Sequence, residues 1–282
     1  MDIKILSPQW GHEHLPVDEF IAKIVDAGYD GIDTWLPDDP MTRKRLLNHI
    51  EEEGLVFVAH QHQAAGNNFK EFQASFKINL EACAAASPVL INSHTGRDYF
   101  THDQLLSLID IASEIADQTN IPIVHETHRG RMGYSPQSTE QLFIQRPGFE
   151  ITADFSHWVC VTESMLGDFE SVLYEAIDRT RHVHARVGYE QGPQVTDPRS
   201  PEWAYALNRF LVWWDAIVAV NRQKNRKILT FTTEFGPFPY MQMIPFTNKA
   251  IASQFDINCY LKDLLRERYI VKVDPESWSI GK

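Results

Sequence analysis

Short apolar runs of strand length alternate along the chain with longer segments in which apolar residues recur at helical spacing. Between residues 17 and 27, for example, Phe20, Ile21, Ile24 and Val25 fall on one stripe, and Gly28 follows as a stop signal. The run over residues 55–59 is continuously apolar, which is typical of parallel strands buried on both faces. The runs cover residues 3–6, 31–35, 55–60, 89–92, 121–126, 150–154, 182–187 and 228–234.

The segments between these runs predict about as many helices. We expect them over residues 17–27, 42–53, 68–86, 101–119 and 135–144, within 165–179 and 201–222, and over 248–267. This alternation in 282 residues matches a (β/α)8 TIM barrel, for which about 250 residues is typical. We therefore predict an α/β fold with a single TIM-barrel domain over residues 1–282, with the barrel at about 3–265 and an irregular C-terminal tail at 269–282. A doubly wound open sheet is the alternative, but it would draw its site from only two or three strands.

Four of the predicted strands deliver a carboxylate or an imidazole at or near the C-terminal end. These residues are Glu126, Asp154, His184 and Glu234. Functional groups collect at the C-terminal face of a parallel barrel, so we expect the four side chains to meet there. Such a set of oxygen and nitrogen ligands suits one divalent metal ion, which would be Mn²⁺, Mg²⁺, Co²⁺ or Zn²⁺.

Glu126 taken alone is also compatible with a solvated loop carboxylate or with an ion pair to Arg129 or Arg131. A carboxylate buried at the end of an apolar strand without a partner would be costly. Asp154 and Glu234 repeat the same pattern at two other strands. The repetition favours a shared site over coincidence.

Further polar residues point to the same rim. His182, His184 and Arg186 alternate and therefore share one face of their strand, with Arg186 nearer the mouth and His182 deeper in a core or supporting position. His157 follows Asp154 where the strand turns into its loop. His157 taken alone is also compatible with a polar loop residue packed beside Trp158.

His60 and His94 end the third and fourth strands. They are either ligands of a second metal ion or hydrogen-bonding partners of substrate, and we expect contact with substrate or water without an obligatory second metal. Four tryptophans are candidates for covering the C–H faces of a sugar, although packing roles are also expected among them. These are Trp10, Trp35, Trp158 and Trp203.

The composition narrows the classes of function. The formal net charge of −12 disfavours a large nucleic-acid surface, which needs an excess of Lys and Arg. We find no apolar stretch of membrane-helix length and no signal-peptide layout. Cys83, Cys160 and Cys259 are expected to be free thiols in a reducing compartment. We therefore expect a cytoplasmic protein that binds a small-molecule carbohydrate and neither nucleic acid nor a membrane. A homo-oligomer is possible.

Four strand-end motifs resemble those of the sugar phosphate isomerase/epimerase superfamily. They are Glu in the fifth strand, Asp-x-x-His in the sixth, His-x-His-x-Arg in the seventh and Glu-Phe-Gly in the eighth. This group of xylose-isomerase-like TIM barrels (AP endonuclease family 2) also includes ketose 3-epimerases, inosose dehydratases and endonuclease IV. In the epimerase branch, the resemblance implies that the four strand-end residues hold one divalent ion. It also implies that His157 and Arg186 contact substrate oxygens, and that Glu126 and Glu234 double as acid and base.

These residue types suit a metal-dependent isomerase or epimerase that acts on a sugar or keto-sugar. A divalent ion chelated by a ketose carbonyl and a neighbouring hydroxyl acidifies the C–H between them and stabilises an enediolate. A carboxylate on either face of that carbon can remove the proton and return one. A keto-sugar or keto-inositol dehydratase on the same metal site is the alternative, and it needs an acid to protonate the leaving hydroxyl.

Two further functions are less favoured. His60 and His94 match the extra zinc ligands of endonuclease IV, but residues 188–201 lack the Asp-x-His pair of that branch, and the net charge of −12 disfavours DNA repair. A non-catalytic sugar binder remains as the other function, because intact ligands do not prove turnover. The chain has no Gly-rich phosphate loop, so a phosphorylated sugar is not favoured over a free one.

Overall fold

The structure of the protein is a computed structural model, of which residues 1–270 are described. Parallel strands β1 to β8 close into a barrel in sequence order, and β8 pairs with β1. The strands are β1 (Asp2–Pro8), β2 (Gly31–Thr34), β3 (Val56–Gln61), β4 (Leu90–Ser93), β5 (Ile123–Glu126), β6 (Ile151–Ala153), β7 (Thr180–Ala185) and β8 (Ile228–Thr233). The predicted (β/α)8 TIM barrel is thus confirmed, and the open sheet is wrong.

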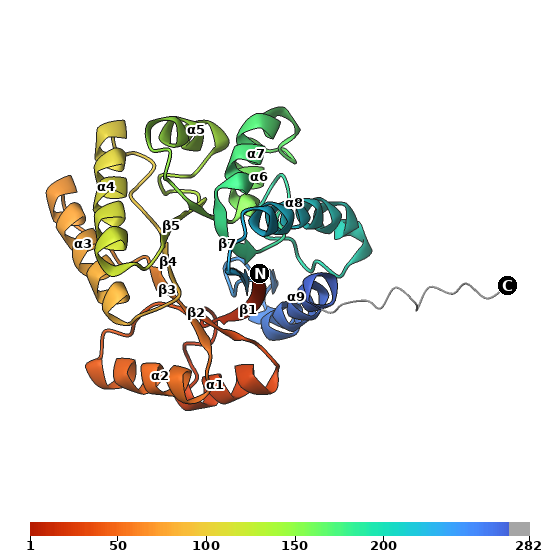
Figure 1. Ribbon diagram of the computed structural model, residues 1–282. Helices are drawn as coiled ribbons and strands as arrows, with labels where there is room; N and C mark the ends of the chain where they lie inside the picture. Colours follow the sequence, from red (N-terminus) through yellow and green to blue (C-terminus); the bar gives the residue numbers. More distant parts are fainter. Residues whose placement is uncertain (271–282) are drawn as a thin grey trace.

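Helices surround the ring of strands on its outside (Figure 1). Their starts follow local signals: Thr101 and Gln104, for example, form a reciprocal capping box in front of α4. The helices are α1 (Val17–Asp26), α2 (Pro40–Glu52), α3 (Phe69–Ala85), α4 (His102–Thr119), α5 (Pro136–Gln145), α6 (Phe155–Thr162), α7 (Glu170–Asp178), α8 (Ala204–Gln223) and α9 (Gln254–Tyr269). Short 3-10 turns at Gly167–Phe169 and Pro201–Trp203 precede α7 and α8.

Two parts of the apolar core in residues 1–270 concern the barrel itself, and a third cluster of Phe235, Met241, Ile257 and Leu261 packs the segment after β8 against α9. The larger part packs the helices against the outer face of the barrel. The smaller part is a cluster of Leu6, Val58, Leu90 and Val124 from four different strands. Side chains two residues apart share one face of a strand, so the residues that follow this cluster by two positions point in the same direction. These residues are Pro8, His60, Asn92 and Glu126. The small cluster is therefore the apolar floor beneath the polar strand ends.

The expected start of the last helix, at residue 248, is wrong. Residues 243–250 instead form a two-stranded hairpin of β9 (Met243–Ile244) and β10 (Lys249–Ala250). Phe246 and Asn248 adopt left-handed backbone angles, with φ of 65° and 54°, which a helix does not allow. The helix starts only after Ser253, whose side chain caps the backbone N–H of Asp256.

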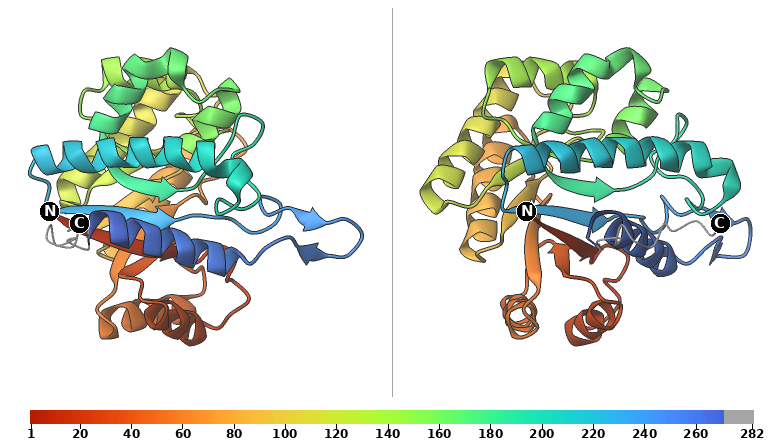
Figure 2. Two further views of the ribbon diagram at one scale, coloured as in Figure 1. Left: turned by 90° about the vertical axis from the view of Figure 1, so that its right-hand side faces the viewer. Right: turned by 45° about the vertical axis from the view of Figure 1, so that its right-hand side comes forward.

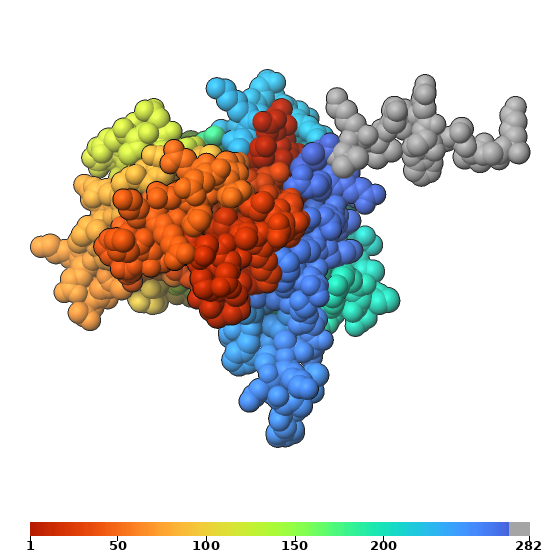
Figure 3. All heavy atoms as spheres, turned by 90° about the horizontal axis from the view of Figure 1, so that it is seen from below, coloured from red at the N-terminus to blue at the C-terminus, as the bar shows by residue number. Residues whose placement is uncertain are grey.

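The hairpin projects beyond the ends to which the barrel strands point (Figure 2). In the space-filling view it stands out from the body of the molecule as an arm (Figure 3). Helix α9 continues through Tyr269, where the irregular tail was expected to begin, and residues 271–282 of that tail lie outside the described residues. No helix in the described part of the chain combines the length and the apolarity that crossing a membrane requires.

Helix α6 was not expected from the sequence. It follows β6 directly because the side chain of Asp154 accepts a hydrogen bond from the backbone N–H of Ser156 and so caps the first turn. Asp154 is therefore the N-cap of a buried helix as well as a strand-end carboxylate.

Candidate functional site

The four strand-end residues come together above the apolar floor. Ligand atoms of Glu126, Asp154, His184 and Glu234 all lie within 4.8 Å of one another. All four residues are buried. They come from β5, β7 and the positions directly after β6 and β8. The closure of the barrel is what brings together groups that are distant in the sequence.

Glu126 is held from the neighbouring strand and from the loop that follows it. Its Oε2 accepts a hydrogen bond from Asn92 Nδ2 at 2.8 Å and lies 3.0 Å from His94 Nε2. Its Oε1 is buried and has no hydrogen-bond partner among residues 1–270. Burial raises the pKa of Glu126, but His94 and His184 outweigh burial and hold the pKa well below its usual value. Glu126 is therefore an ionised carboxylate with one oxygen available for a ligand.

Asp154 divides its two oxygens between structure and site. Oδ1 accepts hydrogen bonds from the backbone N–H and the hydroxyl of Ser156. Oδ2 lies 3.1 Å from Arg186 Nε and 3.6 Å from His157 Nε2. Burial raises the pKa of Asp154 to about 6, although Arg186 opposes the shift. Only Oδ2 faces the other strand-end carboxylates, so Asp154 can offer one ligand atom.

Arg186 lies between two of the expected metal ligands. Its Nη2 is 2.6 Å from Glu234 Oε2, and its Nε pairs with Asp154. Burial lowers the pKa of Arg186, but Glu234 and Asp154 outweigh burial and raise it. The guanidinium is thus a permanent positive charge inside the carboxylate cluster, which is a more buried position than the mouth of the barrel.

Two aromatic rings cover this guanidinium. Its central carbon is 4.6 Å from the ring centroid of Tyr240 and 5.4 Å from that of Trp10, which are cation–π distances. Trp10 can approach because residue 236 is glycine, and a Cβ at that position would collide with the indole ring. The Gly in the Glu-Phe-Gly motif therefore has a steric function at the site.

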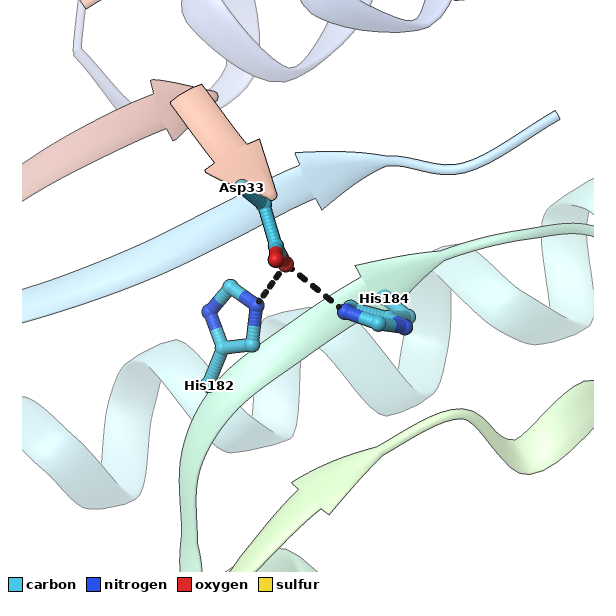
Figure 4. Close-up of side chains that lie close together, drawn as sticks. All are labelled: Asp33, His182 and His184. Carbon is cyan, nitrogen blue, oxygen red and sulfur yellow. Dashed lines mark hydrogen bonds and ion pairs between the residues drawn. The ribbon is translucent and has the colours of Figure 1, made fainter. Parts of the chain in front are cut away.

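His184 has a carboxylate on each side of its ring. Nδ1 lies 2.7 Å from Glu234 Oε2, although not in hydrogen-bonding geometry, and 3.5 Å from Glu126 Oε2. Nε2 lies 2.9 Å from Asp33 Oδ2 (Figure 4). Burial lowers the pKa of His184, but Glu234 and Glu126 outweigh burial and raise it well above its usual value. Nδ1 therefore faces the place where carboxylate oxygens converge.

These donors suit a divalent cation. Three buried carboxylates converge, and among the described residues Arg186 is the one arginine or lysine that pairs with them. Glu126 Oε1 and His184 Nδ1 are buried and have no hydrogen-bond partner. Buried charges require pairing or metal coordination, and mixed carboxylate and imidazole donors are typical of sites for divalent metals.

A cavity of about 390 Å³ opens above the cluster, a volume in the range of small-molecule sites. Six of the predicted site residues line it: Trp35, His60, His94, His184, Arg186 and Glu234. Its further lining residues are Pro8, Trp10, Glu13, Asp33, His62, His128, Thr232 and Tyr240.

Three other candidates lie outside the wall of this cavity. His157 is fully buried behind His128, with ring centroids 3.8 Å apart. Trp158 is a core residue that donates to the carbonyl of Gly133 at 2.8 Å. Trp203 packs against Tyr189 on a different part of the surface. The structure thus places Trp10 and Trp35 at the cavity, and not these two tryptophans.

One wall of the cavity is made of imidazoles. Successive ring centroids are 5.4 Å apart for His62 and His60, 4.6 Å for His60 and His94, and 4.5 Å for His94 and His128. Burial lowers the pKa of His62 and His128 to about 4 and that of His94 well below its usual value. These three rings are neutral near pH 7, so they can donate and accept hydrogen bonds.

The imidazole wall also contains further groups with metal-binding geometry. His60 and His94 form one such group with Glu126, and His128 and His157 form another with the same glutamate. The expectation that His60 and His94 contact substrate without an obligatory second metal therefore stays a prediction.

The residues of the site that sequence reasoning missed include Asp33, Asn92, His128 and Tyr240. Two of them carried a usable signal. Asp33 is a charged residue inside an apolar parallel strand, and Asn92 follows the floor residue Leu90 by two positions, as Glu126 follows Val124. His128 and Tyr240 lie in loops, where no periodicity indicates which side chains turn towards the barrel axis.

Comparisons with known proteins agree with this architecture. The chain is similar in shape to the probable 3-DHS dehydratase AsbF involved in petrobactin synthesis from Bacillus anthracis, with a TM-score of 0.60 and 16% identity, over 94% of this chain and 99% of that one. It is also similar to the 3-keto-D-glucoside 4-epimerase YcjR from E. coli, with a TM-score of 0.61 and 13% identity, over 94% of this chain and 100% of that one.

At these identities the structural likeness concerns the fold alone. No curated protein matches the chain by sequence. The family model described as xylose isomerase-like TIM barrel matches residues 21–201, which is more than half of the 282 residues. The protein therefore belongs to the xylose isomerase-like TIM barrel family.

Proposed function

We propose that the protein is an isomerase or epimerase that depends on a divalent metal and acts on a sugar or keto-sugar through an enediolate. The observation that carries the proposal is the convergence of three carboxylates and one imidazole within 4.8 Å at the base of a small-molecule cavity. The structural neighbours include a dehydratase and a keto-sugar epimerase, which is compatible with this class of chemistry.

The metal ligands in this proposal are Glu126, Asp154, His184 and Glu234. When bound, the ion would polarise a substrate carbonyl and lower the pKa of the adjacent C–H. The chain contributes a cavity with buried ligands at its base, and Arg186 would supply a permanent charge beside the oxygens on which negative charge develops.

The acid and base functions are assigned to the two glutamates. Glu234 lines the cavity, so it is the better placed of the two to remove a proton from a bound substrate. Glu126 is fully buried, and its Oε2 is held by Asn92 and His94. In an epimerase, the second group must deliver a proton to the opposite face, and Glu126 or an imidazole of the cavity wall would do so.

The proposal is tested by turnover in D₂O with a panel of ketoses and keto-sugars, monitored by NMR on Mg²⁺- or Zn²⁺-loaded protein. We expect solvent deuterium on the carbon beside the carbonyl, in product or in remaining substrate, and loss of turnover after chelation with EDTA. Turnover without any exchange would favour a hydride shift and reduce both glutamates to ligands.

The same spectra distinguish the alternatives. A product that has lost water would assign the site to the dehydratase alternative. Binding of a panel sugar without turnover, on protein shown to carry metal, would favour a non-catalytic sugar binder and contradict the proposal.

A further inference from the structure

We propose that Asp33 is the positioning residue of the site, because it fixes which nitrogen of His184 faces the metal. The inference rests on the proposed function, since it concerns a ligand of the proposed ion. Asp33 lies in β2 and His184 in β7, so the contact crosses the interior of the barrel (Figure 4).

One oxygen of Asp33 is the centre of a hydrogen-bond network. Oδ2 lies 2.9 Å from His184 Nε2 and 3.1 Å from His182 Nε2, and it accepts from Thr232 Oγ1 at 2.9 Å. All three partners are buried. Three donors around one oxygen fix its position from β7 and β8 together.

This network selects the tautomer of His184. An ionised carboxylate only accepts hydrogen bonds, so Nε2 carries the proton that is donated to Asp33 at 2.9 Å. Asn92 Nδ2, itself a donor, lies 3.2 Å from the same nitrogen, but it makes its shorter hydrogen bond, 2.8 Å, to Glu126 Oε2. When the ring binds a metal it must be neutral, and its lone pair is then on Nδ1, which faces Glu126 and Glu234. A histidine that binds metal commonly donates its other N–H to a carboxylate, which fixes the ring and increases its basicity.

The surroundings of Asp33 indicate that its carboxylate is there to accept hydrogen bonds from His182 and His184. Asp33 is 5% exposed, and in the described part of the chain it forms no ion pair with Lys or Arg. A buried carboxylate without a cation is costly unless strong hydrogen bonds stabilise it. His182 completes the arrangement, because its Nδ1 is held in turn by Thr230 Oγ1 at 2.6 Å.

The test is the isosteric substitution Asp33→Asn. The amide is uncharged, so its oxygen is a weaker acceptor for the His184 N–H than the carboxylate. If the NH₂ faces the ring instead, the ring must change tautomer, which places a proton on the metal-facing nitrogen. We expect Mn²⁺ affinity, measured by isothermal titration calorimetry, to fall about 10–100-fold, while the circular dichroism spectrum is retained.

Tyr29→Phe is the matched control. Tyr29 is also buried and near Asp33 in sequence, and its hydroxyl hydrogen-bonds to Thr233 Oγ1 at 3.0 Å on β8, outside the network. The Tyr29→Phe substitution removes one buried hydrogen bond and leaves the contacts of Asp33 unchanged, so the Mn²⁺ affinity should stay at the wild-type value. A parallel loss in both variants would indicate a general structural effect and overturn the inference.

A second measurement does not depend on a variant that folds. In wild-type protein loaded with Zn²⁺, long-range ¹H–¹⁵N NMR of the histidine rings should show that His184 keeps its proton on Nε2 and binds through Nδ1. Ligation through Nε2 would overturn the inference, and so would a second tightly bound ion at Asp33.

The two proposals fail in different ways. If wild-type protein binds neither Mn²⁺ nor Zn²⁺, the proposed function is refuted, and the inference is refuted with it. If wild-type protein binds metal and Asp33→Asn binds it equally well, only the positioning role is refuted.

Discussion

At the scale of single residues, the two glutamates of the site have the same chemistry and different surroundings. Glu234 shares Oε2 between Arg186 and His184 and faces the cavity. Burial raises its pKa, but Arg186 and His184 outweigh burial and lower it. Glu126 lies deeper and is held by a neutral amide and a neutral imidazole. Because Glu234 faces the cavity and Glu126 does not, we expect Glu234 to contribute more to proton transfer than Glu126.

We expect Glu234→Gln, prepared with metal bound, to lower kcat by about 10²–10⁴-fold with a much smaller change in KM, because a proton-transfer group acts mainly in the transition state. Steady-state kinetics on the substrate identified in the D₂O panel would measure this. Glu114→Gln, on the exposed face of α4, should behave like wild type. A Glu234→Gln enzyme that retains its metal and its kcat would contradict the assignment.

At the scale of elements, strand β2, which carries Asp33, begins at Gly31, and the absence of a side chain at Gly31 lets β2 pack closely against its neighbours. Gly31 pairs with Leu6 of β1 and with Val56 of β3. A Cβ at this position would collide with the carbonyl oxygen of Val56, and it would lie 2.8 Å from Leu6 Cδ2. The absence of a side chain therefore sets the close packing of three strands below the site.

We predict that Gly31→Ala lowers the free energy of unfolding by about 1–3 kcal/mol, because a backbone carbonyl cannot move aside as a flexible side chain can. Urea denaturation followed by circular dichroism would show the shift in midpoint. Gly148→Ala is the matched control, since its Cβ would meet nothing within 4 Å, and we expect a change within about 0.5 kcal/mol. Equal midpoints for the two variants would refute the steric argument.

At the scale of the whole molecule, closure of the barrel concentrates negative charge at one end of its interior. Glu234 and Glu126 raise the pKa of Asp154, Glu126 raises that of Glu234, and Arg186 compensates only part of the negative charge. Folding must therefore bring like charges together in a buried place. A cation that binds only the folded state would stabilise the entire domain.

We expect Mn²⁺ at 100 times its dissociation constant to raise the free energy of unfolding by about 2.7 kcal/mol relative to protein in EDTA. Asp154→Asn should lose most of this increment, because it removes a ligand charge from the site. The measurement is urea denaturation of both proteins with and without Mn²⁺. An equal increment in the variant would mean that the ion binds elsewhere.

Much of the fold could be predicted, because its signals are local. Each predicted strand overlaps an observed one, since apolar runs and turn residues report the burial of each segment directly. The hairpin before α9 was not predicted, because its course depends on left-handed angles at Phe246 and Asn248 that leave no hydrophobic period. Helix α6 was not predicted, because the Asp154–Ser156 cap lies within the Asp-x-x-His motif, which was interpreted only as a source of metal-binding and substrate-binding side chains.

The sequence by itself determined the alternation of strands and helices and the carboxylates and imidazoles at the strand ends, because side-chain periodicity depends on near neighbours along the chain. Only the tertiary structure decided which of these groups touch. Asp33 meets His184 across 151 residues, and Arg186 meets Glu234 across 48. Such contacts depend on how eight strands tilt and close around a common axis, and no local pattern encodes that geometry.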